Sequence, residues 1–165
     1  MRKQFQYGAV GAAALACVAL SAAAETGAYA VAQTGSAAGQ VFDIGPDPAG
    51  LPANCPFPNN DATFHFLDGT MVQHGTTNKN GDWGGETLEG TAIFYEDTTP
   101  LYQGHVTIWT GGGNNAKSQS EGGFTLTFHG TGSLGSLDIH ANFHQTSNAN
   151  GNSTANVANV SVTCS

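Results

Sequence analysis

Apolar and polar residues alternate through most of the chain after residue 61. Phe124, Leu126 and Phe128 alternate with polar residues, and the segment from Leu137 to Phe143 repeats the pattern. A period of two places successive side chains on opposite faces of a β-strand. The sequence therefore predicts strands near residues 62–67, 70–76, 86–96, 101–110, 122–130, 136–146 and 154–164.

Runs rich in glycine and asparagine separate these segments, and no window shows a helical stripe. Short connections join sequential strands as antiparallel hairpins, and residues 41–44 can add a short edge strand. A meander of about seven to eight strands must bury one apolar face and protect its edges. We therefore predict an all-β domain over residues 61–165, closed as a small antiparallel barrel, with a β-sandwich as the alternative.

The hairpin around Gly132–Gly135 can be placed in register. Its apolar pairs are Phe128 with Ile139, Leu126 with Ala141, and Phe124 with Phe143. The opposite face then pairs His129 with Asp138, Thr127 with His140, and Thr125 with Asn142. A slip by one residue would place apolar side chains opposite polar ones, so the pattern strongly favours this register.

The N-terminus has the pattern of a secretory signal peptide. Arg2 and Lys3 precede an apolar run, and small residues follow it. We predict a signal peptide over residues 1–24, with cleavage after Ala24 or as late as Ala30. Residues 31–60 hold five of the six prolines and are expected to form an arm or linker. The mature protein is therefore expected outside the cell or at its surface.

Cleavage would leave two cysteines, Cys55 and Cys164. Two cysteines in an exported chain most simply form one disulfide. The bond would enclose about 108 residues and fasten the two ends of the domain, a constraint worth roughly 4–5 kcal/mol in the loop-entropy model.

The charge of the predicted mature chain is strongly negative. Beyond residue 24, two lysines stand against twelve acidic residues, which gives a formal charge of −10. Such a surface repels nucleic acids and anionic membranes. The partners left open are a neutral or cationic small ligand, a glycan or another copy of the chain, so a monomer and a homo-oligomer both remain open.

Histidines are the most suggestive reactive side chains. We predict a polar face on the hairpin, made by His129, Asp138, His140, Asn142 and His144. His129 beside Asp138 is half of a general-base arrangement, yet the sequence places no nucleophile next to it. No H-x-H pair exists, and the glycine pattern at 130–135 precedes a strand where the dinucleotide motif needs a helix. No catalytic residue, resident metal or cofactor is predicted.

Two weaker patterns indicate binding. The aromatic residues Trp83, Trp109, Tyr95 and Tyr102 are candidates for a patch that stacks on sugars or peptides. Oxygen ligands occur at spacings like those of an EF-hand loop, at Asn78, Asn80, Asp82, Glu86 and Glu89. This second segment lacks the central glycine and lies between strands, so a solvated acidic loop is the favoured interpretation.

Over residues 55–164 the chain resembles small exported proteins of high-GC Gram-positive bacteria. The resemblance rests on the entry Cys55-Pro56-Phe57-Pro58, on the segments 104–109 and 124–132, and on the terminal Cys164. The expected barrel outline is similar to those of allene oxide cyclase and dirigent proteins. No catalytic residue of those enzymes matches a position here, so the resemblance implies no activity.

The favoured function is a secreted, non-catalytic β-barrel with an extracellular binding or structural role. One alternative is a small-ligand carrier or a cyclase- or isomerase-like enzyme with its site in the barrel mouth. Another is a subunit of a surface layer or fibre that assembles through edge strands.

Overall fold

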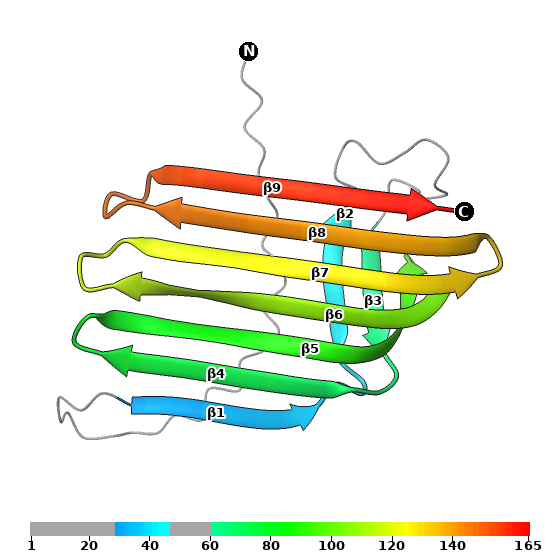
Figure 1. The fold of residues 1–165 in the computed structure, drawn as a ribbon, viewed down its shortest axis with the longest axis horizontal. Coiled ribbons are helices and arrows are strands. Elements are labelled where there is room, and N and C mark those ends of the chain that lie inside the picture. The colour runs from blue at the N-terminus through cyan, green and yellow to red at the C-terminus, as the bar shows by residue number, and fades with distance from the viewer. Residues whose placement is uncertain (1–28, 47–60) are drawn as a thin grey trace, which may run out of the picture.

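The computed structural model describes residues 29–46 and 61–165, which form nine strands and no helix. All nine strands belong to one antiparallel sheet (Figure 1). The strands are β1 (Tyr29–Ser36), β2 (Val41–Pro46), β3 (Asp61–Phe66), β4 (Thr70–Asn78), β5 (Gly81–Glu96), β6 (Thr99–Asn115), β7 (Ser120–Gly132), β8 (Gly135–Ser147) and β9 (Ser153–Cys164).

The main sheet has the order β1-β4-β5-β6-β7-β8-β9 and is open. Strands β1 and β9 are its two edges and do not pair with each other, so the predicted closure into a barrel is wrong. The physical reason lies in β5 and β6, whose ends curl over one face of the sheet (Figure 1). The sheet buries apolar surface by folding over itself at one end, which removes the need for closure.

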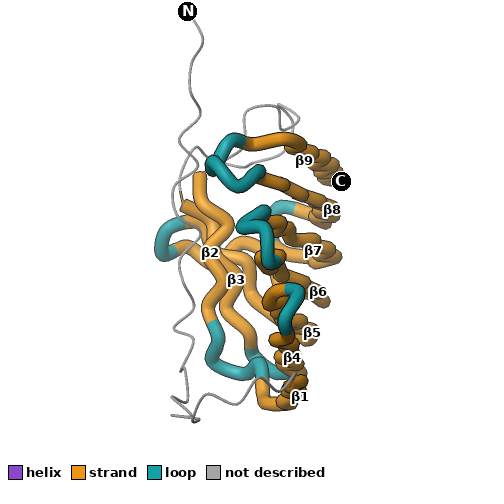
Figure 2. Tube along the Cα trace, turned by 90° about the vertical axis from the view of Figure 1, so that its left-hand side faces the viewer, coloured by secondary structure: helices purple, strands orange, loops and turns teal. Residues whose placement is uncertain are grey.

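Strand β5 belongs to two layers. Its first part, residues 81–89, pairs with β4, and its last part, residues 92–96, pairs with β3. Gly90 lies where the layers diverge, and any side chain there would meet the carbonyl oxygen of Asp68 at 2.2 Å. The last part of β5 and the first part of β6, which pair with each other, form together with β2 and β3 what we call the folded-over layer, which lies on one side of the main sheet (Figure 2).

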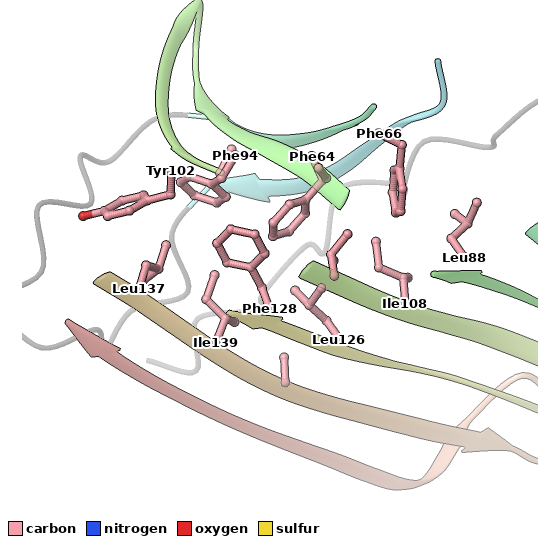
Figure 3. Close-up of a cluster of buried hydrophobic side chains, with 14 of the residues drawn as sticks. Phe64, Phe66, Leu88, Phe94, Tyr102, Ile108, Leu126, Phe128, Leu137 and Ile139 are labelled. Atoms are coloured by element: carbon pink, nitrogen blue, oxygen red, sulfur yellow. The ribbon is translucent and has the colours of Figure 1, made fainter. Parts of the chain in front are cut away.

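The core lies between the folded-over layer and the main sheet (Figure 3). Phe64 is fully buried, and its ring centre lies 5.3 Å from that of Phe94 and 5.0 Å from that of Phe128. These three rings join β3, β5 and β7. The main sheet contributes further buried residues, namely Leu88, Val106, Ile108, Leu126, Leu137, Ile139 and Ala141.

All seven strands predicted after residue 61 are present, and the edge strand predicted near 41–44 is β2. The predicted hairpin register is confirmed at every pair, from Phe128 opposite Ile139 to Phe124 opposite Phe143. The predicted arm at 31–60 contains two strands of the sheet, since β1 falls mostly within it and β2 wholly within it. The break expected at 78–85 is shorter in the structure, because residues 81–85 lie inside β5, and the break expected at 111–115 lies wholly inside β6.

Several predictions concern residues outside the described ranges. The signal peptide over residues 1–24 with its first cleavage site, residues 47–60 and Cys55 all lie there, whereas the later predicted cleavage site, after Ala30, falls within β1. Cys164 ends β9 and packs against the core. Its pairing with Cys55 stays a prediction, because Cys55 lies outside the described residues. Within the described residues, no helix is long and apolar enough to cross a membrane.

Candidate functional site

The main sheet has one face that nothing in the described structure covers. Its inner face carries Leu88, Ile108 and Leu126 and is covered at one end by the folded-over layer. The opposite face, here called the outer face, carries the alternate residues of each strand and lies away from that layer (Figure 2). No described segment blocks the approach of a ligand to the outer face.

All five predicted polar residues lie on the outer face, with His129, Asp138 and His140 at one end of it and Asn142 and His144 further along β8. His129 lies directly between His105 on β6 and Asp138 on β8, and Nδ1 of His129 contacts Oδ1 of Asp138. Nε2 of His105 lies 3.5 Å from Oε1 of Glu89, and both side chains are well exposed. His140 stands opposite Thr127 in the next row of residues. All of these side chains except Glu89, Asn142 and His144 line an open hollow of about 320 Å³.

Two arrangements typical of catalytic sites, a histidine–hydroxyl pair and a cluster of metal ligands, are not formed by the described residues of this hollow. Among the described residues, neither His129 nor His140 forms a hydrogen bond with a hydroxyl group, so no activated nucleophile is assembled. The same part of the chain contains no group of three or more His, Cys, Asp or Glu residues placed to hold a metal ion. The histidines also face open solvent, because there is no barrel and hence no barrel mouth for the enzyme or carrier alternative.

A row of glycines crosses the middle of the outer face. Gly85, Gly111 and Gly123 are direct neighbours on β5, β6 and β7. The same row continues to His74 on β4 and to His144 on β8, so two histidines stand at its ends. Three adjacent residues without side chains leave the sheet backbone bare in this row, and that leaves room for rings from neighbouring positions.

Aromatic rings occupy the space above these glycines. A methyl group on Gly111 would lie 2.7 Å from Cζ2 of Trp109, and one on Gly85 would lie 3.3 Å from the ring of His74. The ring centres of His74 and Trp83 are 4.9 Å apart. We call Trp83, His74 and Trp109 the aromatic platform. Each of the three side chains is half-buried against the sheet.

The predicted aromatic patch is thus divided by the fold. Trp83 and Trp109 share the outer face. Tyr95 packs against His65 in the folded-over layer, with ring centres 4.3 Å apart. Tyr102 is only 2% exposed and belongs to the core, so it cannot contribute to a surface. Burial raises the pKa of the Tyr102 hydroxyl, which no described residue hydrogen-bonds.

The five predicted calcium ligands do not converge. Asn78 and Gly81 close the β4–β5 hairpin, in which Oδ1 of Asn78 accepts a hydrogen bond from the backbone N–H of Asn80. Asp82 and Glu86 then project on the inner face of β5, while Glu89 projects on the outer face. Successive side chains of a strand point to opposite faces, so Glu89 lies on the other side of the sheet from Asp82 and Glu86. The EF-hand-like site is therefore not formed.

A cavity of about 440 Å³ adjoins Trp83 at the loop end of the sheet. It lies among the β4–β5, β6–β7 and β8–β9 turns, and none of the residues that line it is basic. Its polar lining includes Asn78, Asn80, Asp82, Asn115, Gln119 and Glu121. This cavity could not be predicted from the sequence, because its residues come from three separate hairpins.

Comparisons of the chain with protein-family models, with curated proteins and with solved structures found no match. The function is therefore inferred from the geometry of the outer face.

Proposed function

We propose that the protein is an exported, non-catalytic binding protein whose outer face binds a neutral polysaccharide. The observation that carries this proposal is the aromatic platform. Trp109 lies over Gly111, His74 lies over Gly85, and the ring of Trp83 lies beside that of His74. Three neighbouring strands supply the rings, so their spacing is set by the register of the sheet.

The chemistry of such a platform suits sugar rings. A pyranose has a face of C–H groups, which packs against an indole by burying apolar area and by attraction to the π-electrons. Its hydroxyl groups need hydrogen-bonding partners at the edge of that contact, because an unpaired polar group that loses water is costly. The amides and carboxylates of the cavity beside Trp83 supply such partners. A flat, open face also suits a long chain better than a small enclosed molecule.

Charge narrows the class of ligand. The chain beyond residue 24 carries two lysines against twelve acidic residues, and Glu121 and Asp82 line the cavity next to the platform. Anionic polysaccharides would be repelled by this surface. A neutral chain avoids that repulsion, so we propose neutral polysaccharides as the ligand class.

Export would place the ligand outside the cell. We propose that residues 1–24 are a signal peptide and that Cys55 and Cys164 form a disulfide, both of which suit a protein that works outside the cell. Mass spectrometry of the protein from culture medium tests this part directly. A mature N-terminus after residue 24 or 30 is expected, and retention of the whole chain inside the cell would contradict it.

Sedimentation with insoluble polysaccharides tests the binding. Microcrystalline cellulose and chitin are suitable neutral probes, and pectate is an anionic control. We expect binding to a neutral probe that Trp109→Ala and Trp83→Ala weaken at least tenfold, with unchanged circular dichroism. Tyr95→Ala is the matched control, because it removes an aromatic ring from the folded-over layer. Equal binding by the Trp109→Ala variant, or tighter binding to pectate, would contradict the proposal.

A further inference from the structure

Strand β9 is an edge strand of twelve residues. Its one partner among the described strands is β8. An unpaired edge offers a row of backbone donors and acceptors to any chain that can lie beside it. The edge of β9 that faces away from β8, here called the outer side of β9, is therefore a candidate for pairing with another strand.

The direction of the backbone groups on β9 follows from its C-terminal end. Ser136 and Ser165 exchange two hydrogen bonds, with N···O distances of 2.7 and 3.2 Å. Alternate residues of an antiparallel strand direct their backbone groups to the same neighbour. Residues 163, 161, 159 and 157 therefore face β8. Asn156, Ala158, Val160 and Val162 direct their N–H and C=O groups away from β8.

The outer side of β9 lacks the usual protection against pairing. Natural edge strands carry lysine, proline, inward-pointing charges or bulges that discourage another strand. The twelve residues of β9 include no charged residue and no proline, although the protein as a whole is strongly acidic. The one irregularity in its register lies at its beginning, opposite Thr146 and Ser147. Val157 and Val160 are exposed to 46% and 49%.

We infer that β9 pairs with β9 of a second copy, as an antiparallel pair about a two-fold axis perpendicular to the sheet. The partner is a second copy because two identical uncharged strands meet without repulsion, and an isologous pair closes as a dimer. Antiparallel pairing continues the pattern of every other strand in the sheet. The outward groups of Ala158 and Val160 lie near the centre of the strand, where the pair would be held most firmly.

This pairing has a consequence for ligand binding. A two-fold axis perpendicular to the sheet keeps both outer faces on the same side, so the two aromatic platforms would face one surface together. Two linked sites bind an extended ligand with higher avidity than one site. This consequence rests on the proposed function, whereas the pairing itself does not.

Analytical ultracentrifugation of the mature protein over a range of concentrations tests the pairing. We expect a dimer that Ala158→Pro converts to a monomer, because proline removes an N–H directed away from β8 and leaves the β8–β9 hydrogen bonds intact. Val160→Lys is a second variant, which places two like charges close together in the dimer. Both variants should keep the circular dichroism of the wild type.

The matched control is Ala32→Pro on the other edge. Ala37 donates its N–H to the carbonyl oxygen of Gly69 at 3.1 Å, so by alternation the N–H of Ala32 points away from β4. This variant should remain a dimer. A monomeric wild type at all concentrations would overturn the inference, as would a dimer that survives both β9 variants. Loss of assembly in Ala32→Pro would also overturn it, because β1 would then be part of the contact.

Discussion

The indole of Trp109 occupies the space in which a side chain at position 111 would stand. The two residues are on the same strand and the same face, and a methyl group on Gly111 would lie 2.7 Å from Cζ2 of Trp109. Carbon atoms that are not bonded to each other do not approach so closely. Gly111 therefore permits the pose in which the indole lies against the sheet and presents its other face to solvent.

Gly111→Ala is expected to weaken polysaccharide binding without unfolding the protein. The new methyl group would displace the flexible end of the Trp109 side chain, and it would also lie close to the carbonyl oxygen of Gly84, at 3.1 Å. We expect about a tenfold loss of affinity, which corresponds to about 1.4 kcal/mol. Sedimentation with the neutral probe measures it.

Gly122→Ala is the matched control for that substitution. It introduces the same methyl group on the neighbouring strand, on the inner face, where the nearest atom is the carbonyl oxygen of Gly111 at 3.7 Å. Its binding should equal that of the wild type. Equal binding by both alanine variants would show that the pose of Trp109 does not matter for the ligand.

Phe64→Ala is expected to destabilise the fold strongly. Phe64 is fully buried and its ring contacts Phe94 and Phe128, so its removal leaves a cavity between the two layers. Substitutions of this kind cost about 3–5 kcal/mol. Urea unfolding followed by fluorescence measures the change.

Phe124→Ala serves as the comparison for the core. Phe124 is half-buried on the inner face, where its ring stacks on that of Phe143 at 5.9 Å between centres. Its loss should cost clearly less than that of Phe64, because less apolar area returns to water. Equal losses in the two variants would mean that the folded-over layer contributes little to the core.

Tyr102→Phe is expected to preserve or increase stability at neutral pH. The hydroxyl of Tyr102 is buried, and no described residue hydrogen-bonds it. Folding therefore removes water from this hydroxyl without supplying another hydrogen-bond partner. Removal of such a group is neutral or stabilises by about 1 kcal/mol. A loss of more than about 1 kcal/mol on thermal or urea unfolding would show that the hydroxyl has a partner.

The same substitution should change the response to alkaline pH. Burial raises the pKa of Tyr102 above its ordinary value of 10. Between pH 10 and the raised pKa, the unfolded chain releases this proton and the folded chain retains it, so the wild type loses stability as pH rises through that window. Tyr102→Phe lacks this contribution and should lose less. Parallel curves for the two proteins above pH 10 would contradict the argument.

The strands and their register could be predicted from the sequence because alternation is a local signal. The pairing of Phe128 with Ile139 and of His129 with Asp138 follows from the turn at Gly132–Gly135 alone. The fold-over could not be predicted in this way. It depends on β5 changing partners from β4 to β3 near Gly90, and residues far apart in the sequence meet there.

The sequence predicts two of the three residues of the aromatic platform, Trp83 and Trp109, and misses His74 and the glycines beneath the rings. Glycine usually marks a turn, so the sequence predicts breaks at 78–85 and 111–115. These glycines lie inside strands, where they leave room for Trp109 and His74 to lie over the backbone. A glycine within a strand that stands two residues from a tryptophan is the signal that could have revealed the platform.

Formation of the disulfide between Cys55 and Cys164 is the last prediction. Cys164 packs against the core at the end of β9, so a bond there would fix the segment before β3 to the last strand. Intact mass under non-reducing conditions should be two mass units below that of the reduced chain, and blocking reagents should add nothing without prior reduction. Cys55→Ser should lower the free energy of unfolding by up to roughly 4–5 kcal/mol. The reduced wild type should show the same loss, which makes it the control. Two alkylated cysteines in the unreduced protein from culture medium would refute the bond, because the enclosed loop would then have no covalent closure.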